Sequence, residues 1–175
     1  KSIVLRFSNE ISKIIQPGDR CLLVSENRPE WMISDLSIML AGGITVPAYT
    51  TYVTRDYEYI ISDCSPSVVI VSNDEQFNKI SEICKKNSCI KKIFSFEKLS
   101  GIVSKSYLNI ENLINDTNLF KEIKLQKHAN RTDPACIIYT SGTQGNPKGV
   151  ILSHGGILSN CEGGYELLKP ILETE

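Results

Sequence analysis

The chain has 175 residues, of which 41% are hydrophobic and 22% charged. This is the composition of a globular domain with a core, not of a disordered or fibrous chain. The formal net charge of −1 offers no basic face for nucleic acid, and no apolar run approaches the ~20 residues needed to cross a bilayer.

The first predicted elements are two short strands separated by a helix. Residues 21–24 form a continuous apolar run, typical of a strand buried on both faces. Pro29 suits the first turn of a helix, because its missing N–H is not needed there, and Gly42 ends that helix. Residues 44–46 are the next strand, which we expect Pro47 to stop.

A second cycle of helices and strands follows the same pattern. We expect Thr54 to cap a helix with one apolar face, and residues 68–71 to form another buried strand. Asn73 is expected to cap a third helix, and a further strand begins at residues 93–94. Alternating strands and helices imply parallel pairing with right-handed crossovers. Residues 19–96 are therefore predicted to form one α/β unit with helices on both faces of a parallel sheet.

The second half of the chain is less regular up to about residue 132. Its apolar residues predict one short helix, containing Leu108, Ile110, Leu113 and Ile114. Residues 135–139 then read as a strand that enters a loop rich in Gly, Ser and Thr. An apolar strand resumes at residues 150–152, and Ser153 is a candidate cap for a helix beginning near Gly155.

The six cysteines form no C-x-x-C pair, and the chain has only two histidines. A zinc site of thiolates and imidazoles is therefore not expected, and neither is any other metal site. Cys21, Cys64 and Cys136 lie in apolar runs, where cysteine behaves as a small hydrophobic residue. We expect the thiols to be reduced and buried and the protein to be cytoplasmic.

The loop at residues 140–149 is the candidate site for chemistry. It carries three hydroxyl side chains and three glycines within ten residues. Glycine lets the main chain approach an anion closely, exposed N–H groups and hydroxyls donate to phosphate oxygens, and Lys148 adds a mobile charge. The order of residues differs from the mononucleotide P-loop, in which Lys is followed by Ser or Thr. Composition alone leaves an ordinary polar hairpin open as an alternative.

The order of residues from Tyr139 to Val150 resembles the signature loop of the adenylate-forming superfamily, which includes acyl-CoA synthetases, adenylation domains and luciferases. The resemblance continues through residues 18–20, 25–31, 42–47 and 49–51, and is strongest to the long-chain fatty acyl-CoA synthetase branch. Two positions depart from the family pattern. Gln144 stands where the loop usually has Thr, and Gly156 stands where Asn is common.

The resemblance implies an α/β fold, a parallel-sheet layered subdomain from the N-terminal domain of such an enzyme. Residues 1–175 would be part of the AMP-binding domain, with its remainder and the C-terminal domain absent. The full-length protein would be an ATP-dependent long-chain fatty acid–CoA ligase, an enzyme of fatty acid metabolism that uses ATP, Mg2+ and coenzyme A. Its reaction forms an acyl-adenylate and then acyl-CoA from a fatty acid substrate.

The same resemblance assigns the binding of the β- and γ-phosphates to the loop 139–149. The residues carried over are Thr140, Ser141, Gly142, Thr143, Gln144, Gly145 and Lys148. They would act by positioning and charge stabilisation, so no catalytic residue and no metal ligand is assigned. His154 is read either as a residue near the nucleotide or as a packing residue. Trp31 is read as a packing anchor of its helix.

Two alternatives to this function stay open. The first is an adenylating enzyme for another carboxylic acid, such as an aryl or amino acid. The second is a non-enzymatic α/β module that binds phosphate, because one fold hosts many functions. The 175 residues by themselves are expected to catalyse no ATP–pyrophosphate exchange. Peripheral membrane contact of the full-length protein, its oligomeric state and the acyl chain length are left open.

Overall fold

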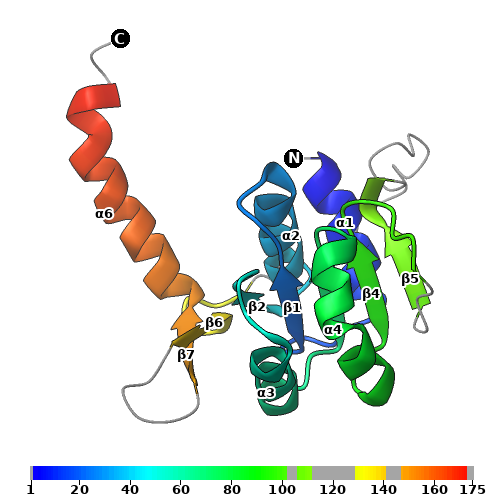
Figure 1. Ribbon diagram of the computed structural model, residues 1–175. Coiled ribbons are helices and arrows are strands. Elements are labelled where there is room, and N and C mark those ends of the chain that lie inside the picture. Colours follow the sequence, from blue (N-terminus) through cyan, green and yellow to red (C-terminus); the bar gives the residue numbers. More distant parts are fainter. Residues whose placement is uncertain (1, 102–105, 112–128, 141–146, 173–175) are drawn as a thin grey trace.

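The computed structural model describes residues 2–101, 106–111, 129–140 and 147–172. They form one sheet in the strand order β5-β4-β3-β1-β2-β6-β7, covered by helices (Figure 1). The strands are β1 (Arg20–Val24), β2 (Ile44–Ala48), β3 (Val68–Val71), β4 (Lys92–Ser95), β5 (Ser106–Asn109), β6 (Pro134–Thr140) and β7 (Lys148–Ser153). The helices are α1 (Ser2–Ser12), α2 (Pro29–Leu40), α3 (Thr54–Cys64), α4 (Asp74–Lys86) and α6 (His154–Leu172).

The sheet is parallel from β5 to β6, as predicted for residues 19–96. β1 lies at the centre, between β2 and β3, and β3, β4 and β5 continue in parallel register. β6 is parallel to β2, whereas β7 is antiparallel to β6. All four residues of β3 are buried, which is why the sequence there is a continuous apolar run rather than an alternating one.

Helices cover both faces of the sheet, which confirms that part of the prediction. Successive side chains of a strand point to opposite faces, so each strand feeds two separate cores. Cys21 and Leu23 of β1 pack in the core beneath α1 and α2. Leu22 and Val24 of the same strand pack in the other core, beneath α3 and α4.

Of the two predicted helix caps, Asn73 is confirmed and Thr54 is wrong. The Asn73 side chain accepts a hydrogen bond from the Gln76 N–H at 3.1 Å, so Asn73 caps α4 as expected. Thr54 is instead the first residue of α3, and Val53 occupies the cap position. The Asp56 carboxylate compensates by accepting from the Val53 N–H at 3.1 Å. This bond is the half of a capping box that the third helical residue supplies, whereas the Val53 side chain has no oxygen to accept from the helix N–H groups.

Two other predictions were wrong. Pro47 does not stop β2, which extends to Ala48. The register pairs β2 with β6 only at Thr45, and proline is tolerated where no ladder donor is required. Leu108 lies in β5, opposite Phe94 of β4, whereas Ile110 is already helical, so the predicted helix begins after Leu108 and its predicted start was wrong. Pairing with the edge of β4 overrides the local helical spacing, while the end of that proposed helix, residues 113–114, lies outside the described residues.

Helix α1 was not anticipated from the sequence. Its Phe7 and Ile11 are fully buried against the sheet. The Phe7 ring meets the Phe94 ring edge-to-face, with centroids 5.0 Å apart. Edge-to-face pairs of this kind add to the free energy gained from burial alone. The core on the α2 face therefore depends on the first dozen residues of the chain.

The cysteines are all free, and four of them are buried. Cys21, Cys64 and Cys136 are buried, as expected from their apolar surroundings. Burial raises the pKa of Cys64 to about 12 and that of Cys136 to about 11, so neither thiol is ionised at neutral pH. Cys89 and Cys161 are exposed, so the expectation that the thiols are buried was wrong for these two. Cys89 follows the end of α4, and Cys161 lies on an exposed stretch of α6.

Strands β6 and β7 and helix α6 stand to one side of the other elements (Figure 1). Within the described residues, no helix combines the length and the hydropathy needed to cross a membrane. The two strands form an antiparallel hairpin next to β2, and α6 extends away from it. This hairpin carries the residues of the predicted phosphate-binding loop that the structure describes.

Candidate functional site

The candidate site lies at the end of the hairpin formed by β6 and β7. Thr140, the first residue of the predicted loop, lies directly opposite Lys148 in the antiparallel register. Side chains at directly opposite positions share one face of the sheet, with Cβ atoms about 4.5–5.5 Å apart. Thr140 and Lys148 are exposed. The five other predicted residues, Ser141, Gly142, Thr143, Gln144 and Gly145, lie outside the described residues.

In the next pair of the hairpin, one residue is buried and the other is a glycine. Tyr139 lies opposite Gly149, and the Tyr139 side chain is only 3% exposed. A Cβ atom added at Gly149 would lie 2.9 Å from Ile137 Cγ2 and 3.3 Å from Tyr139 Cζ. Glycine is therefore favoured next to Lys148, because a side chain there would overlap the Ile137 methyl group and press against the Tyr139 ring. Because successive side chains of a strand alternate, Thr140 and Lys148 lie on the face of the hairpin opposite to that of the buried Tyr139 ring.

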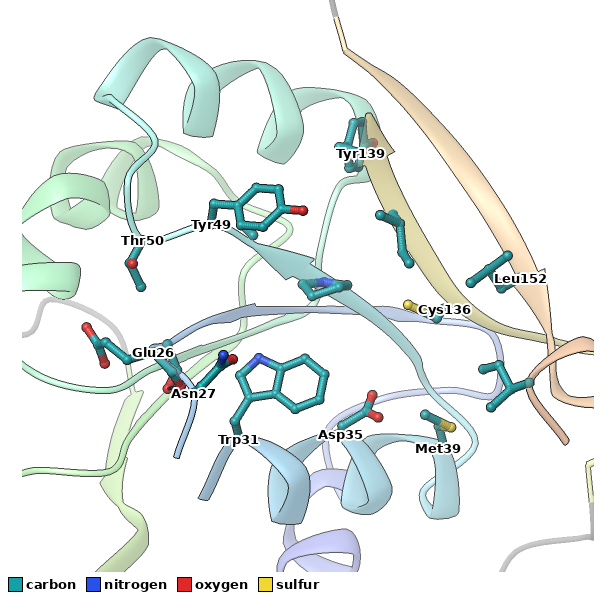
Figure 2. A pocket seen from close by; sticks show the side chains of 15 residues that line it. Glu26, Asn27, Trp31, Asp35, Met39, Tyr49, Thr50, Cys136, Tyr139 and Leu152 are labelled. Carbon is teal, nitrogen blue, oxygen red and sulfur yellow. Dashed lines mark hydrogen bonds between the residues drawn. The ribbon is translucent and has the colours of Figure 1, made fainter. Parts of the chain in front are cut away.

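A pocket of about 630 Å³ lies between α2, the end of β2 and the hairpin (Figure 2). Its walls are mainly apolar, with Trp31 and Met39 from α2, Tyr49 after β2 and Cys136 from β6. Asp35 of α2 adds a carboxylate to this lining, and burial raises the pKa of Asp35 above its usual value. The predicted packing role of Trp31 agrees with its contact with the core, although its side chain also borders the pocket.

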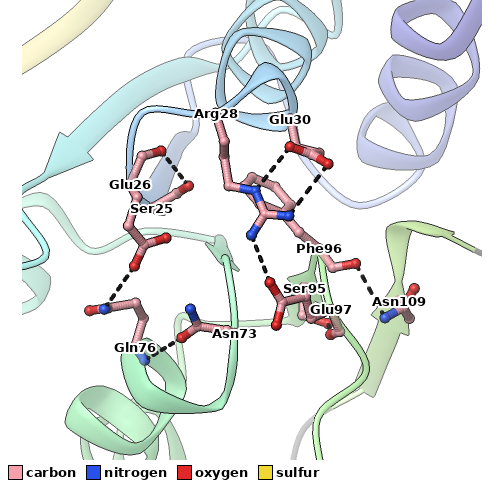
Figure 3. A network of polar contacts seen from close by, with 10 residues as sticks. All are labelled: Ser25, Glu26, Arg28, Glu30, Asn73, Gln76, Ser95, Phe96, Glu97 and Asn109. Atoms are coloured by element: carbon pink, nitrogen blue, oxygen red, sulfur yellow. Dashed lines mark hydrogen bonds and ion pairs between the residues drawn. The ribbon is translucent and has the colours of Figure 1, made fainter.

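A network of ion pairs occupies the carboxyl edge of the sheet (Figure 3). Arg28 Nε lies 3.0 Å from Glu30 Oε2, and Arg28 Nη1 lies 2.8 Å from Glu97 Oε1. The guanidinium also lies over the Phe96 ring, 5.5 Å from its centroid. The hydrogen bonds to Glu30 and Glu97 raise the pKa of Arg28 further. Arg28 thus ties the start of α2 to the loop after β4, and its charge is already neutralised by two carboxylates.

The charge of Lys148, unlike that of Arg28, is not neutralised by neighbouring carboxylates among the described residues. No ion pair joins Lys148 to another residue within the described ranges. Its exposed side chain lies on the same face of the hairpin as the exposed Thr140, directly opposite it in the register. Of the cations that the motifs suggested, Lys148 is therefore the one whose surroundings suit an anionic ligand.

The start of α6 is built against the turn that precedes β6. The His154 N–H donates to the Asp133 carbonyl at 3.0 Å, and the Gly155 N–H donates to the Arg131 carbonyl at 2.7 Å. Ser153 Oγ accepts from the Gly156 N–H at 3.2 Å, so Ser153 caps α6 as predicted. α6 begins at His154, the residue after the cap. These contacts give His154 a backbone role at the helix start, whereas its ring forms no hydrogen bond to another described residue.

Sequence comparison relates the whole chain to one enzyme family. A model of the AMP-binding enzyme family matches residues 3–171. Over 138 residues the chain is 38% identical to long-chain-fatty-acid–CoA ligase ACSBG2 of Rattus norvegicus, which corresponds to 75% of this chain and 20% of that protein. Over 182 residues it is 33% identical to long chain acyl-CoA synthetase 3 of Arabidopsis thaliana, covering 98% of this chain and 27% of that protein. The chain therefore spans only 20% to 27% of the length of these two relatives.

Solved structures agree with this relationship. A long-chain-fatty-acid CoA ligase structure from Rhodopseudomonas palustris matches with a TM-score of 0.80 at 20% identity, over 96% of this chain and 40% of that chain. The anthranilate CoA ligase AuaEII in complex with anthranoyl-AMP matches with a TM-score of 0.65 at 26% identity, over 86% of this chain and 29% of that chain. The parallel sheet and its helices are thus those of the N-terminal domain of adenylate-forming enzymes. Since the family model also covers nearly every residue, the chain belongs to the AMP-binding enzyme family.

Proposed function

We propose that the chain is part of the N-terminal AMP-binding domain of an ATP-dependent long-chain fatty acid–CoA ligase. In this proposal residues 139–149 form its phosphate-binding loop, and Thr140, Ser141, Gly142, Thr143, Gln144, Gly145 and Lys148 bind the β- and γ-phosphates of ATP. The long-chain fatty acid–CoA ligases among the relatives support the choice of substrate class. Because the chain spans a minor part of those relatives, the activity is proposed for the full-length protein.

The observation that carries the proposal is the register that sets Thr140 opposite Lys148. It brings a hydroxyl donor and a cation to one exposed face at the tip of a hairpin, which is the donor set that phosphate oxygens require. The motifs contain two other cations. Arg28 is engaged by Glu30 and Glu97, and Arg20 donates to carbonyl groups at the end of α3. Neither is available to a nucleotide in the same way. The residues described here therefore fit the phosphate groups of ATP.

The reaction proposed for the full-length protein has two steps. The carboxylate of the fatty acid attacks the α-phosphorus of ATP, which forms an acyl-adenylate and releases pyrophosphate. The thiol of coenzyme A then attacks the acyl carbon and releases AMP. Lys148 and Thr140 hold the departing phosphates and stabilise their charge, and neither residue transfers a proton.

The proposed magnesium ion would neutralise charge on the phosphates when bound. The described part of the chain contains no group of three or more His, Cys, Asp or Glu residues that could hold a metal ion. The proposal therefore assigns the ion no ligand among these residues. Binding of ATP by Thr140 and Lys148 does not require a metal ligand from the same hairpin.

One specific observation favours a second acid substrate class. AuaEII, which matches this chain in fold and at 26% identity, is an anthranilate CoA ligase. An aryl acid would use the same phosphate-binding loop, so the hairpin does not distinguish the two classes. Rates of acyl-adenylate formation by the full-length protein with palmitate and with anthranilate would do so. A preference for anthranilate would replace the fatty acid in the proposal.

Substitution of Lys148 by alanine in the full-length protein tests the role of the loop. A hydrogen bond to a charged group is worth roughly 1.5–3 kcal/mol, and each ~1.4 kcal/mol is tenfold in rate. Lys148→Ala should therefore slow single-turnover acyl-adenylate formation by about ten- to a hundredfold. Transfer from preformed acyl-adenylate to coenzyme A should change little, because the pyrophosphate has already left. Lys148→Arg should recover only part of the rate, since a planar guanidinium replaces a compact ammonium.

Lys98→Ala is the matched control. Lys98 is also exposed, but it lies beside Arg28 and Glu97 and not on the hairpin. Its loss should leave both half-reactions within about twofold of the wild type, as expected for a surface substitution away from the site. Equal slowing of both half-reactions by Lys148→Ala would contradict a phosphate-binding role and point to a general folding defect.

A further inference from the structure

Tyr139 connects the hairpin of the proposed phosphate site to helix α3. Its ring packs across Gly149, so one side chain contacts both strands of the hairpin just before their paired ends. On its other side, the ring meets the Tyr59 ring of α3 edge-to-face, with centroids 6.4 Å apart and planes at 89°. The hairpin is thus joined to α3 by aromatic packing at the residue that precedes Thr140.

A hydrogen bond reinforces this packing. The Tyr139 hydroxyl donates to the Asp63 carboxylate of α3, a residue 76 positions away in the sequence. Burial raises the pKa of Tyr139 above its usual value, as does its hydrogen bond to Asp63, so the hydroxyl stays protonated and keeps donating at neutral pH. A hydrogen bond to a carboxylate is roughly twice as strong as one between neutral groups.

The end of α3 that presents Asp63 is itself held in place. Arg20 of β1 donates from Nε to the Cys64 carbonyl at 2.7 Å and from Nη2 to the Ser65 carbonyl at 3.3 Å. Ser65 ends the helix in the left-handed region, with φ of 45°. The guanidinium therefore satisfies carbonyl groups that a helix end leaves without partners. Asp63 consequently sits on an element fixed to the central strand of the sheet.

The paired register between β2 and β6 ends early, although the two strands lie side by side and pack together. The register of β2 and β6 pairs Thr45 with Cys136, three residues before Tyr139. Beyond that point β6 continues toward Thr140, with β7 as its paired strand. Tyr139 therefore supplies contacts to the main α/β unit where the strand pairing with β2 has ended.

We propose that Tyr139, held by Asp63, is a positioning residue for the proposed adenylation reaction. Its hydrogen bond fixes the paired ends of β6 and β7, and with them Thr140 and Lys148, relative to the central sheet. The inference rests on the proposed function, in which these two side chains bind the phosphates of ATP. Small displacements of a group that binds a reacting phosphate lower the rate strongly, because the reaction depends on geometry.

The test uses three variants of the full-length protein: Tyr139→Phe, Asp63→Ala and the double variant. Tyr139→Phe keeps the ring and removes only the hydroxyl, so the packing against Gly149 and Tyr59 is preserved. The matched control is Tyr107→Phe at the far end of the sheet. Tyr107 also loses hydrogen bonds on this change, to Ser95 Oγ at 2.9 Å and from the Leu99 N–H at 3.1 Å.

Two measurements are made on each variant. Single-turnover kinetics give the rate of acyl-adenylate formation from ATP and palmitate, and separately the rate of transfer from preformed acyl-adenylate to coenzyme A. Amide hydrogen exchange gives the opening of residues 134–140 and 148–153, with α4 as an internal reference. Tyr139→Phe and Asp63→Ala should each slow adenylation about tenfold, and the double variant no further, because both remove the same bond.

The remaining expectations separate positioning from a general loss of stability. Exchange in the two hairpin strands should become faster in all three variants, while exchange in α4 and the transfer half-reaction stay within about twofold of the wild type. Tyr107→Phe should leave both adenylation and hairpin exchange unchanged. This pattern would support the positioning role.

Four results would overturn it. Additive effects of the two single changes would show that Tyr139 and Asp63 act independently. Faster hairpin exchange without slower adenylation would show that the bond is structural only. Wild-type protein without adenylation activity would refute the proposed function and the positioning role together, whereas active wild type with fully active variants would refute the positioning role alone.

Discussion

Gly149→Ala should destabilise the chain even though it adds a single methyl group to an exposed residue. The added Cβ would lie 2.9 Å from Ile137 Cγ2 and 3.3 Å from Tyr139 Cζ, both on the facing strand. Ile137 is β-branched and stiff at χ1, so its methyl group cannot move away without a shift of the strand. Overpacking of this kind costs about 1–3 kcal/mol. The smaller entropy of the unfolded alanine chain offsets about 0.4–1 kcal/mol of that cost.

The net loss expected for Gly149→Ala is therefore about 1–2 kcal/mol, which lowers the midpoint of thermal unfolding by about 2–8 °C for a chain of this size. Circular dichroism melts of the 175-residue chain give this value. Gly163→Ala is the matched control, because a Cβ at Gly163 in α6 meets nothing within 4 Å. That change should stabilise the helix by about 0.5–1 kcal/mol.

A second substitution isolates the steric cause. Ile137→Leu removes the Cγ2 methyl group that the new Cβ would meet, so it should be less destabilising in the Gly149→Ala background than in the wild type. A coupling of about 0.5–1 kcal/mol is expected for two residues in contact. Gly149→Ala with wild-type stability, or independent effects of the two changes, would refute the argument that close packing requires glycine at this position.

Two further predictions concern other parts of the fold. Phe7→Ala should cost about 3–5 kcal/mol in urea unfolding, because Phe7 is fully buried against Phe94; a loss below about 1 kcal/mol would contradict the packing of α1. Asp35→Asn should raise stability at pH 7, because burial raises the pKa of Asp35 in the folded state and ionisation then costs stability. This gain should shrink as the pH falls through the folded pKa and vanish below the unfolded pKa of about 3.9, and a gain independent of pH would refute the burial argument.

Arg28 and Lys148 are both cations in family-like segments, but their surroundings differ. Both residues belong to segments that resemble the adenylate-forming enzymes. Arg28 is bound on two sides by carboxylates, and its charge serves the connection between α2 and the loop after β4. Lys148 has no such partner among the described residues and faces solvent at the hairpin tip. The resemblance assigned phosphate binding to Lys148 and no ligand to Arg28, and the charges around the two residues are consistent with that proposal.

Local patterns in the sequence were sufficient for the parallel α/β unit. Apolar runs such as residues 68–71 predicted strands buried on both faces, and β3 is buried at every position. Asn73 marked the start of α4 correctly, because an N-cap depends only on neighbouring backbone groups. The order of residues from Tyr139 to Val150 also indicated the family, since so long a match combines several short-range requirements in one segment.

Other features depended on contacts between residues far apart in the sequence. Leu108 became part of a strand because β4 offers an edge for pairing, which overrides the local helical spacing. The antiparallel register that sets Thr140 opposite Lys148 was likewise decided by strand pairing. The bond between Tyr139 and Asp63 spans 76 positions, and no local pattern marks either residue as a partner of the other. Periodicity reports which face of an element is apolar, but the pairing of elements is set by packing of the whole domain, so only the tertiary structure decided these contacts.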